Sequence, residues 1–314
     1  MPELKPATGS KEDLAVDVSR CQRMRFRGSS CQQCLDLCPH GAITLENGLA
    51  LDAEQCRGCL LCTTVCPVGA LEPRLDFSVC LAQLARVPEP VLGCIRTKGC
   101  SNATLSCLGG LAEEYLLLLY HTLTGSLTLN LTQCADCSNK PMIALLRQRL
   151  DAIFTAGLSG SHCSIVIVEL VQDLHYRDES VDRRSFLKSC RNYLFKSADI
   201  ILSTIQEESQ RRSEYAEKRL PVRREWLNRT RNKSSQELEV RIGAHFDASI
   251  VFAETCTGCQ GCVAICPTGA LQTESAETPP TFIQRLCTGC GLCREFCLDG
   301  AVRIITGKTT GQSG

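Results

Sequence analysis

The sequence is poor in aromatic residues and has no excess of either charge. Aromatic side chains make up 5% of its 314 residues, and there is a single tryptophan. Lysine and arginine total 34, as do aspartate and glutamate, so the formal net charge is zero. Proteins that bind nucleic acids meet the phosphates with an excess of positive charge. The composition therefore argues against a nucleic-acid partner and predicts a core of modest size.

Long apolar stretches are also absent. The longest one, centred on residues 116–119, is interrupted by Glu113, Glu114 and His121. No run reaches the roughly 18 residues that indicate a transmembrane helix. Residues 1–6 contain no apolar signal region. We therefore expect a cytoplasmic protein with no transmembrane segment.

An internal pair of arginines, Arg183 and Arg184, resembles part of a twin-arginine export signal. Such signals belong at the N-terminus, ahead of an apolar stretch, whereas charged residues interrupt the segment that follows this pair. We expect the two arginines to lie on a basic helix surface. A periplasmic location would follow only if they directed export.

Nucleotide-binding and catalytic signatures are missing as well. No G-x-G-x-x-G follows an expected strand, and no P-loop is present. The five histidines are scattered and predict no catalytic triad. The sequence therefore predicts no catalytic residue and no nucleotide, flavin, molybdenum or nickel site.

Cysteine is the residue in excess, with 24 copies. Thiols stay reduced in the expected compartment, so dense cysteine favours metal or redox chemistry over disulfides. Most of the cysteines accompany four versions of one hexamer, Cys-Pro-x-Gly-Ala followed by an aliphatic residue. These begin at Cys38, Cys66, Cys266 and Cys297, and Leu298 replaces the proline in the last version.

The spacing of the cysteines repeats together with the hexamer. Runs at 56–67 and 256–267 fit C-x-x-C-x-x-C-x-x-x-C-P without deviation, and the run at 287–298 differs only at its proline. The first run keeps this spacing from Cys31 onward, but its leading cysteine must be Cys21, farther upstream. Thiolates at these offsets can wrap an iron–sulfur cubane when glycines let the backbone approach it.

This pattern resembles the bacterial two-cluster ferredoxins, and it does so twice, at about residues 16–76 and 248–306. The resemblance implies two ferredoxin-like modules that hold four [4Fe–4S] clusters, the last cysteine of each run ligating the other cluster of its module. The implied ligand sets are Cys21, Cys31, Cys34 and Cys66; Cys56, Cys59, Cys62 and Cys38; Cys256, Cys259, Cys262 and Cys297; and Cys287, Cys290, Cys293 and Cys266.

Short strands are expected to frame the modules, at 42–45, 70–72, 270–273 and 301–305. The apolar cores of such modules are small, so the clusters would act as staples, as metals do in other small domains. We expect both modules to unfold when the iron is removed.

The segment between the modules predicts a small α/β domain over residues 87–172. Its elements are expected strands at 90–95, 126–131 and 164–169, and expected helices at 108–124 and 141–156. Alternating strands and helices are typical of a parallel sheet.

Cysteines of this domain fall beside the expected ends of its elements: Cys94, Cys107, Cys134 and Cys137, with Cys100 as a spare. Ligands of open α/β sheets gather beyond the carboxyl ends of the strands, so these thiols are expected to converge on a fifth metal or redox site. We favour an iron–sulfur cluster; a zinc ion, a reactive dithiol and unligated buried cysteines are the alternatives. At scattered positions the pattern resembles the cysteine-rich electron-delivery subunits of heterodisulfide reductases and hydrogenases.

Two features have a plainer interpretation. Cys80, Cys163 and Cys190 are isolated in the sequence and are expected to be small buried hydrophobic residues. Residues 173–245 are rich in lysine and arginine and are expected to form a solvated helical connector, with a docking face for an acidic partner as the alternative.

Together these features predict an α+β fold, with two ferredoxin-like dicluster modules at 16–86 and 246–306 flanking the small α/β domain and the helical connector. Tails are expected at 1–15 and 307–314.

We expect an iron–sulfur electron-transfer protein with four or five [4Fe–4S] clusters, a subunit or dedicated partner of a larger oxidoreductase. Its partner would be a redox protein or a catalytic subunit. The alternatives are a catalytic subunit whose middle cysteines face a substrate such as a disulfide, and a redox sensor.

Overall fold

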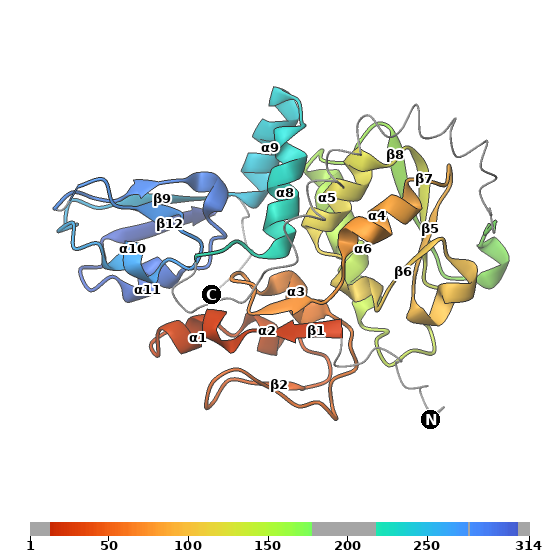
Figure 1. Cartoon of the computed structure of the whole chain (residues 1–314), viewed down its shortest axis with the longest axis horizontal. Coiled ribbons are helices and arrows are strands. Elements are labelled where there is room, and N and C mark those ends of the chain that lie inside the picture. The colour runs from red at the N-terminus through yellow and green to blue at the C-terminus, as the bar shows by residue number, and fades with distance from the viewer. Residues whose placement is uncertain (1–12, 178–217, 276, 307–314) are drawn as a thin grey trace.

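The computed structural model describes residues 13–177, 218–275 and 277–306 (Figure 1). Small two-stranded sheets occur in the cysteine-rich segments near both ends, and a four-stranded sheet lies in the segment between them. Cys190 and the pair Arg183 and Arg184 lie outside the described residues. Across the described part of the chain, no helix combines the length and apolar character needed to cross a membrane.

Two antiparallel strand pairs frame the N-terminal module. β1 (Leu14–Val16) pairs with β4 (Leu71–Pro73), which joins the beginning of the module to its end, and β2 (Ile43–Thr44) pairs with β3 (Ala50–Leu51). The strands expected at 42–45 and 70–72 correspond to β2 and β4. Three short helices complete the module: α1 (Gln22–Arg25), α2 (Gln33–Asp36) and α3 (Leu61–Val65).

The C-terminal module repeats this plan. β9 (Ala248–Phe252) pairs with β12 (Val302–Thr306), and β10 (Leu271–Gln272) pairs with β11 (Thr281–Phe282). Its helices are α10 (Gly261–Ile265) and α11 (Leu292–Phe296). The residues that precede α3 and α10, Leu60 and Gln260, both have a left-handed φ of 59°. The repeat seen in the sequence therefore extends to the backbone geometry.

A parallel sheet with strand order β6-β5-β7-β8 forms the middle of the chain. Its strands are β5 (Val91–Cys94), β6 (Ala103–Leu105), β7 (Gly125–Asn130) and β8 (Cys163–Val168). The sequence did not predict β6, which has only three residues, or α4 (Phe77–Leu84), which precedes the sheet. Because the strands are parallel, their carboxyl ends lie at one edge.

The long helices of this domain are α5 (Glu113–Thr122) and α6 (Met142–Thr155). α5 begins later than expected, because Leu108–Gly110 form a separate 3-10 turn. The leucines from Leu116 to Leu119 are all fully buried, so the middle of this helix is enclosed on every side and lies in the largest core among the described residues.

The described part of the connector is not a solvated link, which corrects the expectation drawn from its charge. In Figure 1, α8 (Val222–Asn232) and α9 (Gln236–Phe246) stand between the C-terminal module and the middle domain. Trp226 and Leu227 of α8 are buried in the core that contains α5. Basic residues of α8 are buried because they meet acids, as Arg223 meets Glu114 at 2.6 Å.

Candidate iron–sulfur sites

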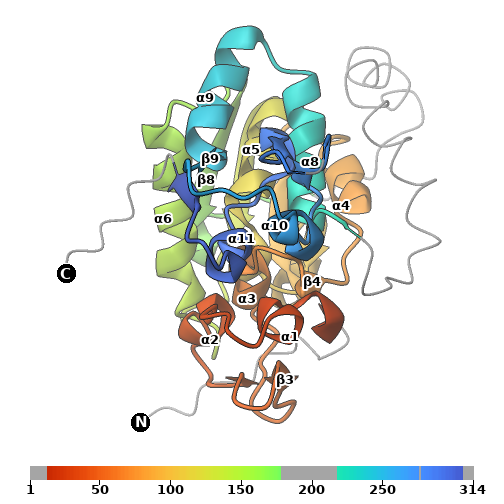
Figure 2. The ribbon, with the colours of Figure 1, turned by 90° about the vertical axis from the view of Figure 1, so that its left-hand side faces the viewer.

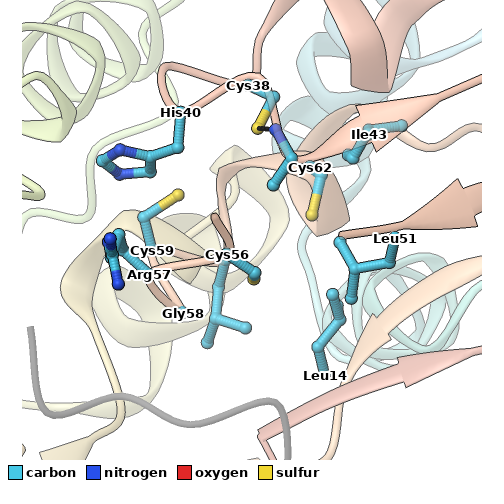
Figure 3. A pocket seen from close by; sticks show the side chains of 12 residues that line it. Leu14, Cys38, His40, Ile43, Leu51, Cys56, Arg57, Gly58, Cys59 and Cys62 are labelled. Carbon is cyan, nitrogen blue, oxygen red and sulfur yellow. Dashed lines mark hydrogen bonds between the residues drawn. The ribbon is translucent and has the colours of Figure 1, made fainter. Parts of the chain in front are cut away.

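Two thiol-lined cavities lie inside the N-terminal module. One, of about 340 Å³, is lined by Cys21, Cys31, Cys34 and Cys66 and is called the Cys34 site below. The other, of about 350 Å³, is lined by Cys38, Cys56, Cys59 and Cys62 and is called the Cys59 site (Figure 3). Each cavity thus combines the cysteines that the ferredoxin resemblance groups together, the distant Cys21 included. Burial raises the pKa of Cys34 to about 12 and that of Cys59 to about 11.

A hydrogen bond to sulfur explains the Gly-Ala pair of the repeated hexamer. The glycine has a positive φ in all four copies, between 60° and 73°, which other residues rarely adopt. In three copies the next alanine N–H donates to the cysteine that opens the hexamer: Ala42 to Cys38 at 3.4 Å, Ala70 to Cys66 at 3.2 Å and Ala301 to Cys297 at 3.3 Å. Such N–H groups stabilise a charged thiolate and tune a bound cluster.

In the C-terminal module, Cys290 interacts with Cys266, Cys287 and Cys293, and this group is called the Cys290 site below. The other expected ligand set, Cys256, Cys259, Cys262 and Cys297, is called the Cys259 site, and in it Cys262 interacts with Cys256 and Cys259. Burial, with added repulsion from neighbouring Cys287 and Cys266, raises the pKa of Cys293 to about 12. The pKa of Cys262 is raised by burial and, to a smaller extent, by Cys256 and Cys259. Cys259 itself is exposed, so the Cys259 site reaches the surface.

The middle domain holds a further thiol-lined cavity, of about 360 Å³. Its four cysteines follow three neighbouring parallel strands: Cys94 ends β5, Cys107 follows β6, and Cys134 and Cys137 follow β7. We call this group the middle site. Cys100 does not line the cavity and is exposed. The strand-end argument thus places the four expected thiols, without the spare one, around one cavity.

The chemistry of the middle site fits an anionic cluster held by thiolates. The side chain of Arg96 lines the cavity, and its Nη1 is buried with no hydrogen-bond partner among the described residues. A buried cation of this kind calls for negative charge or acceptor atoms nearby. Burial raises the pKa of Cys134 to about 12 and also raises that of Cys107, so a metal held by these thiols would have to displace their protons.

In the Cys34, Cys59 and middle sites the four thiols line a cavity. Within the described ranges, no three His, Cys, Asp or Glu side chains converge as ligands of a single metal ion. These three cavities, of about 340, 350 and 360 Å³ with their openings included, are similar in volume. The middle site therefore offers a cofactor the same room as the two N-terminal sites.

The middle site adjoins the Cys59 site through backbone contact. A Cβ placed on Gly109, in the loop after Cys107, would lie 2.4 Å from the Cys59 carbonyl oxygen. Arg149 of α6 spans the junction, donating to the Gly109 carbonyl at 2.9 Å and to Thr64 Oγ1 of α3 at 2.7 Å. Burial lowers the pKa of this arginine to about 10, which leaves it charged near neutrality.

A second junction joins the two cysteine-rich modules. Gln22 is 1% exposed, and its Nε2 donates to the Cys290 carbonyl oxygen at 3.0 Å. The rings of Phe26 and Phe296 meet edge to face, with centroids 5.3 Å apart. α1 lies beneath α11 in both views of the ribbon (Figure 1, Figure 2). The two junctions therefore place the middle site beside the Cys59 site, and the Cys34 site beside the Cys290 site.

Family models identify the two cysteine-rich modules. A 4Fe-4S dicluster domain matches residues 27–70, and a second 4Fe-4S dicluster domain matches residues 249–298. The chain therefore contains two ferredoxin-type dicluster domains, which imply four [4Fe–4S] clusters. This confirms the resemblance inferred from the cysteine spacing.

Curated relatives share short parts of the chain. The indolepyruvate oxidoreductase subunit IorA of Methanothermobacter thermautotrophicus is 36% identical over 64 residues, 19% of this chain and 10% of that protein. The pyruvate synthase subunit PorD of Methanocaldococcus jannaschii is 46% identical over 43 residues, 13% of this chain and 50% of that protein. The chain thus spans at most half the length of these relatives. No solved structure matches the chain.

The structure also places the isolated cysteines and two residues that the sequence did not single out. Cys80 and Cys163 are buried in the largest core, apart from the five sites, as expected for small apolar residues. Asn139 and Arg149, which span the junction of the middle site, were missed. A lone polar residue carries no sequence signal for partners that are distant along the chain.

Proposed function

We propose that this chain is an iron–sulfur electron-transfer protein whose five [4Fe–4S] clusters form one unbranched line. The observations that carry the proposal are the junction of the middle site with the Cys59 site and that of the Cys34 site with the Cys290 site, which favour the order middle, Cys59, Cys34, Cys290 and Cys259. A cluster of this class supplies reversible one-electron exchange. The line has two ends: the middle site, and the Cys259 site with its exposed cysteine.

We assign the ligands of the four dicluster clusters to the four groups of cysteines defined above. Two observations support the assignment. The cavities of the Cys34 and Cys59 sites are each lined by one complete group. The hexamer N–H groups point at Cys38, Cys66 and Cys297, the cysteines that cross to the other cluster of their module. A bond to sulfur at these positions suits a thiolate ligand.

We assign a fifth cubane to Cys94, Cys107, Cys134 and Cys137. Four thiols and no other ligand type favour iron–sulfur chemistry, although a tetrahedral zinc ion can also take four thiolates. The cavity volume supports the cubane, because it matches those of the two N-terminal sites. The buried, unpartnered Nη1 of Arg96 supports an anionic cofactor there.

We propose further that the chain works as a subunit or dedicated partner of a larger oxidoreductase, with the middle α/β domain and the helices α8 and α9 holding the two dicluster modules in line. The sequence predicts no catalytic residue, so a donor and an acceptor must be separate molecules or subunits. The matched relatives carry the names of oxidoreductase subunits, which supports this role.

A reductive titration of the iron-loaded chain, purified without oxygen, tests the proposal. Dithionite should deliver about one electron per cluster, about five per chain, and an oxidised viologen dye should recover them. The Cys134→Ser/Cys137→Ser variant should take up about four. A chain that exchanges no electrons reversibly would contradict the proposal, and turnover of a small disulfide by the isolated chain would identify a catalytic subunit instead.

A further inference from the structure

Asn139 stands where the middle site meets the Cys59 site. The residue is 5% exposed, and its carboxamide contacts groups from both sites. Nδ2 donates to the Arg57 carbonyl oxygen at 3.0 Å and lies 4.0 Å from Cys107 Sγ, while Oδ1 accepts a hydrogen bond from His40 Nε2 at 3.0 Å. Figure 3 shows His40 and Arg57 together on the side of the Cys59 cavity where Cys59 lies.

Local structure does not account for this side chain. At the start of α6 the backbone carbonyl of Asn139, not its side chain, accepts the Met142 N–H at 3.0 Å, and the helix has no side-chain cap. The partners of the carboxamide lie 32, 82 and 99 residues away along the chain. Burying an amide is unfavourable unless it is hydrogen-bonded, and here the bonds join two thiol-lined sites.

We propose that Asn139 is a positioning residue that couples the middle site to the Cys59 site and raises the reduction potential of the middle cluster. The inference rests on the proposed function, because it requires a cluster in the middle site. An N–H directed at a ligating thiolate favours the more negative, reduced form of a cluster. When one electron passes between the two sites, one cluster is oxidised and the other reduced, and no bond forms or breaks.

The same carboxamide fixes the distance between the sites. Through the Arg57 carbonyl it holds the loop between Cys56 and Cys59, and through Cys107 it holds the loop of the middle site. Gly109 allows these loops to approach, since any side chain there would meet the Cys59 carbonyl. Asn139 thus acts on both cavities at once while contacting only one of the eight thiols.

The test is a redox titration, followed by electron paramagnetic resonance, of the iron-loaded full chain. The wave that is absent from the Cys134→Ser/Cys137→Ser variant belongs to the middle cluster. In Asn139→Leu the potential of this wave should become more negative by at least about 59 mV. For a one-electron couple, that shift lowers the ratio of reduced to oxidised cluster at a fixed potential tenfold. The iron content should stay that of the unmodified chain.

Arg149→Lys is the matched control, because it keeps the positive charge at the same junction but loses the forked hydrogen bonds of Arg149 to Gly109, Leu111 and Thr64. This variant should lower the melting temperature and leave the wave in place. If Asn139→Leu loses iron, Asn139→Ser replaces it: the shorter side chain cannot reach Cys107, so the same negative shift is expected.

Two results would overturn the proposal: an unmoved wave in an iron-replete Asn139 variant, or an equal shift in Arg149→Lys. Failure of the proposed function looks different. An unmodified chain without a wave that depends on Cys134 and Cys137 would remove the fifth cluster itself, whatever the Asn139 variants do.

Discussion

Removal of the iron by a chelator will unfold both dicluster modules and leave the middle domain folded. The C-terminal module has a small apolar core, and half of its buried apolar residues are the ligand cysteines Cys262, Cys266, Cys287 and Cys293. The middle domain has a far larger core, built on the buried leucines of α5. A small module held by metal ligands loses its folding energy with the metal, whereas a domain with its own core does not.

Limited proteolysis with mass spectrometry of the fragments measures this effect. After chelation, cleavage should spread through residues 13–73 and 248–306, and a resistant fragment should retain β5 to β8. The iron-loaded chain in the same protease serves as the control and should resist cleavage in both modules. Protection of residues 248–306 in iron-free protein would refute the view that clusters hold this module together.

Asp247→Asn should destabilise the protein by about 3–5 kcal/mol, because it leaves buried positive charge unpaired. Asp247 ends α9 and meets two arginines of α8: its Oδ2 lies 2.5 Å from Arg231 and its Oδ1 lies 3.5 Å from Arg224. The three side chains are at most 5% exposed. Arg224 also donates to the Cys287 carbonyl at 3.0 Å, so the network ties α8 to the C-terminal module.

Thermal unfolding of the iron-loaded protein, followed by circular dichroism without oxygen, checks the size of this effect. A loss of 3–5 kcal/mol corresponds to a melting temperature lower by about 10 °C in a chain of this size. Glu237→Gln is the matched control, since it breaks an exposed pair with Arg241 and should cost about 0–0.5 kcal/mol. A melting temperature of Asp247→Asn equal to that of the control would show that the network adds no stability.

Features with a local signal could be predicted from the sequence. The cysteine runs and their hexamers identify both dicluster domains, because cluster ligands need fixed spacings along the chain. The strands β5 and β8 contain apolar runs and β7 alternates polar and apolar residues, and the strand-end rule brings the cysteines of the middle site together.

Features that depend on contacts between distant segments could not be predicted. β6 has three residues and exists because it pairs with β5. The charges of α8 suggested a solvated helix, yet Glu114 and Asp247, far away in the sequence, neutralise its buried arginines. Asn139 is one asparagine among several, and only the fold brings His40, Arg57 and Cys107 to it.

The central claim is that a fifth cluster continues the line of the four dicluster clusters. Iron and acid-labile sulfide per chain, measured on protein purified without oxygen, test it most directly. We predict about twenty irons for the unmodified chain and about four fewer for Cys134→Ser/Cys137→Ser. About sixteen irons in both proteins would contradict the claim and leave the middle site without a cluster.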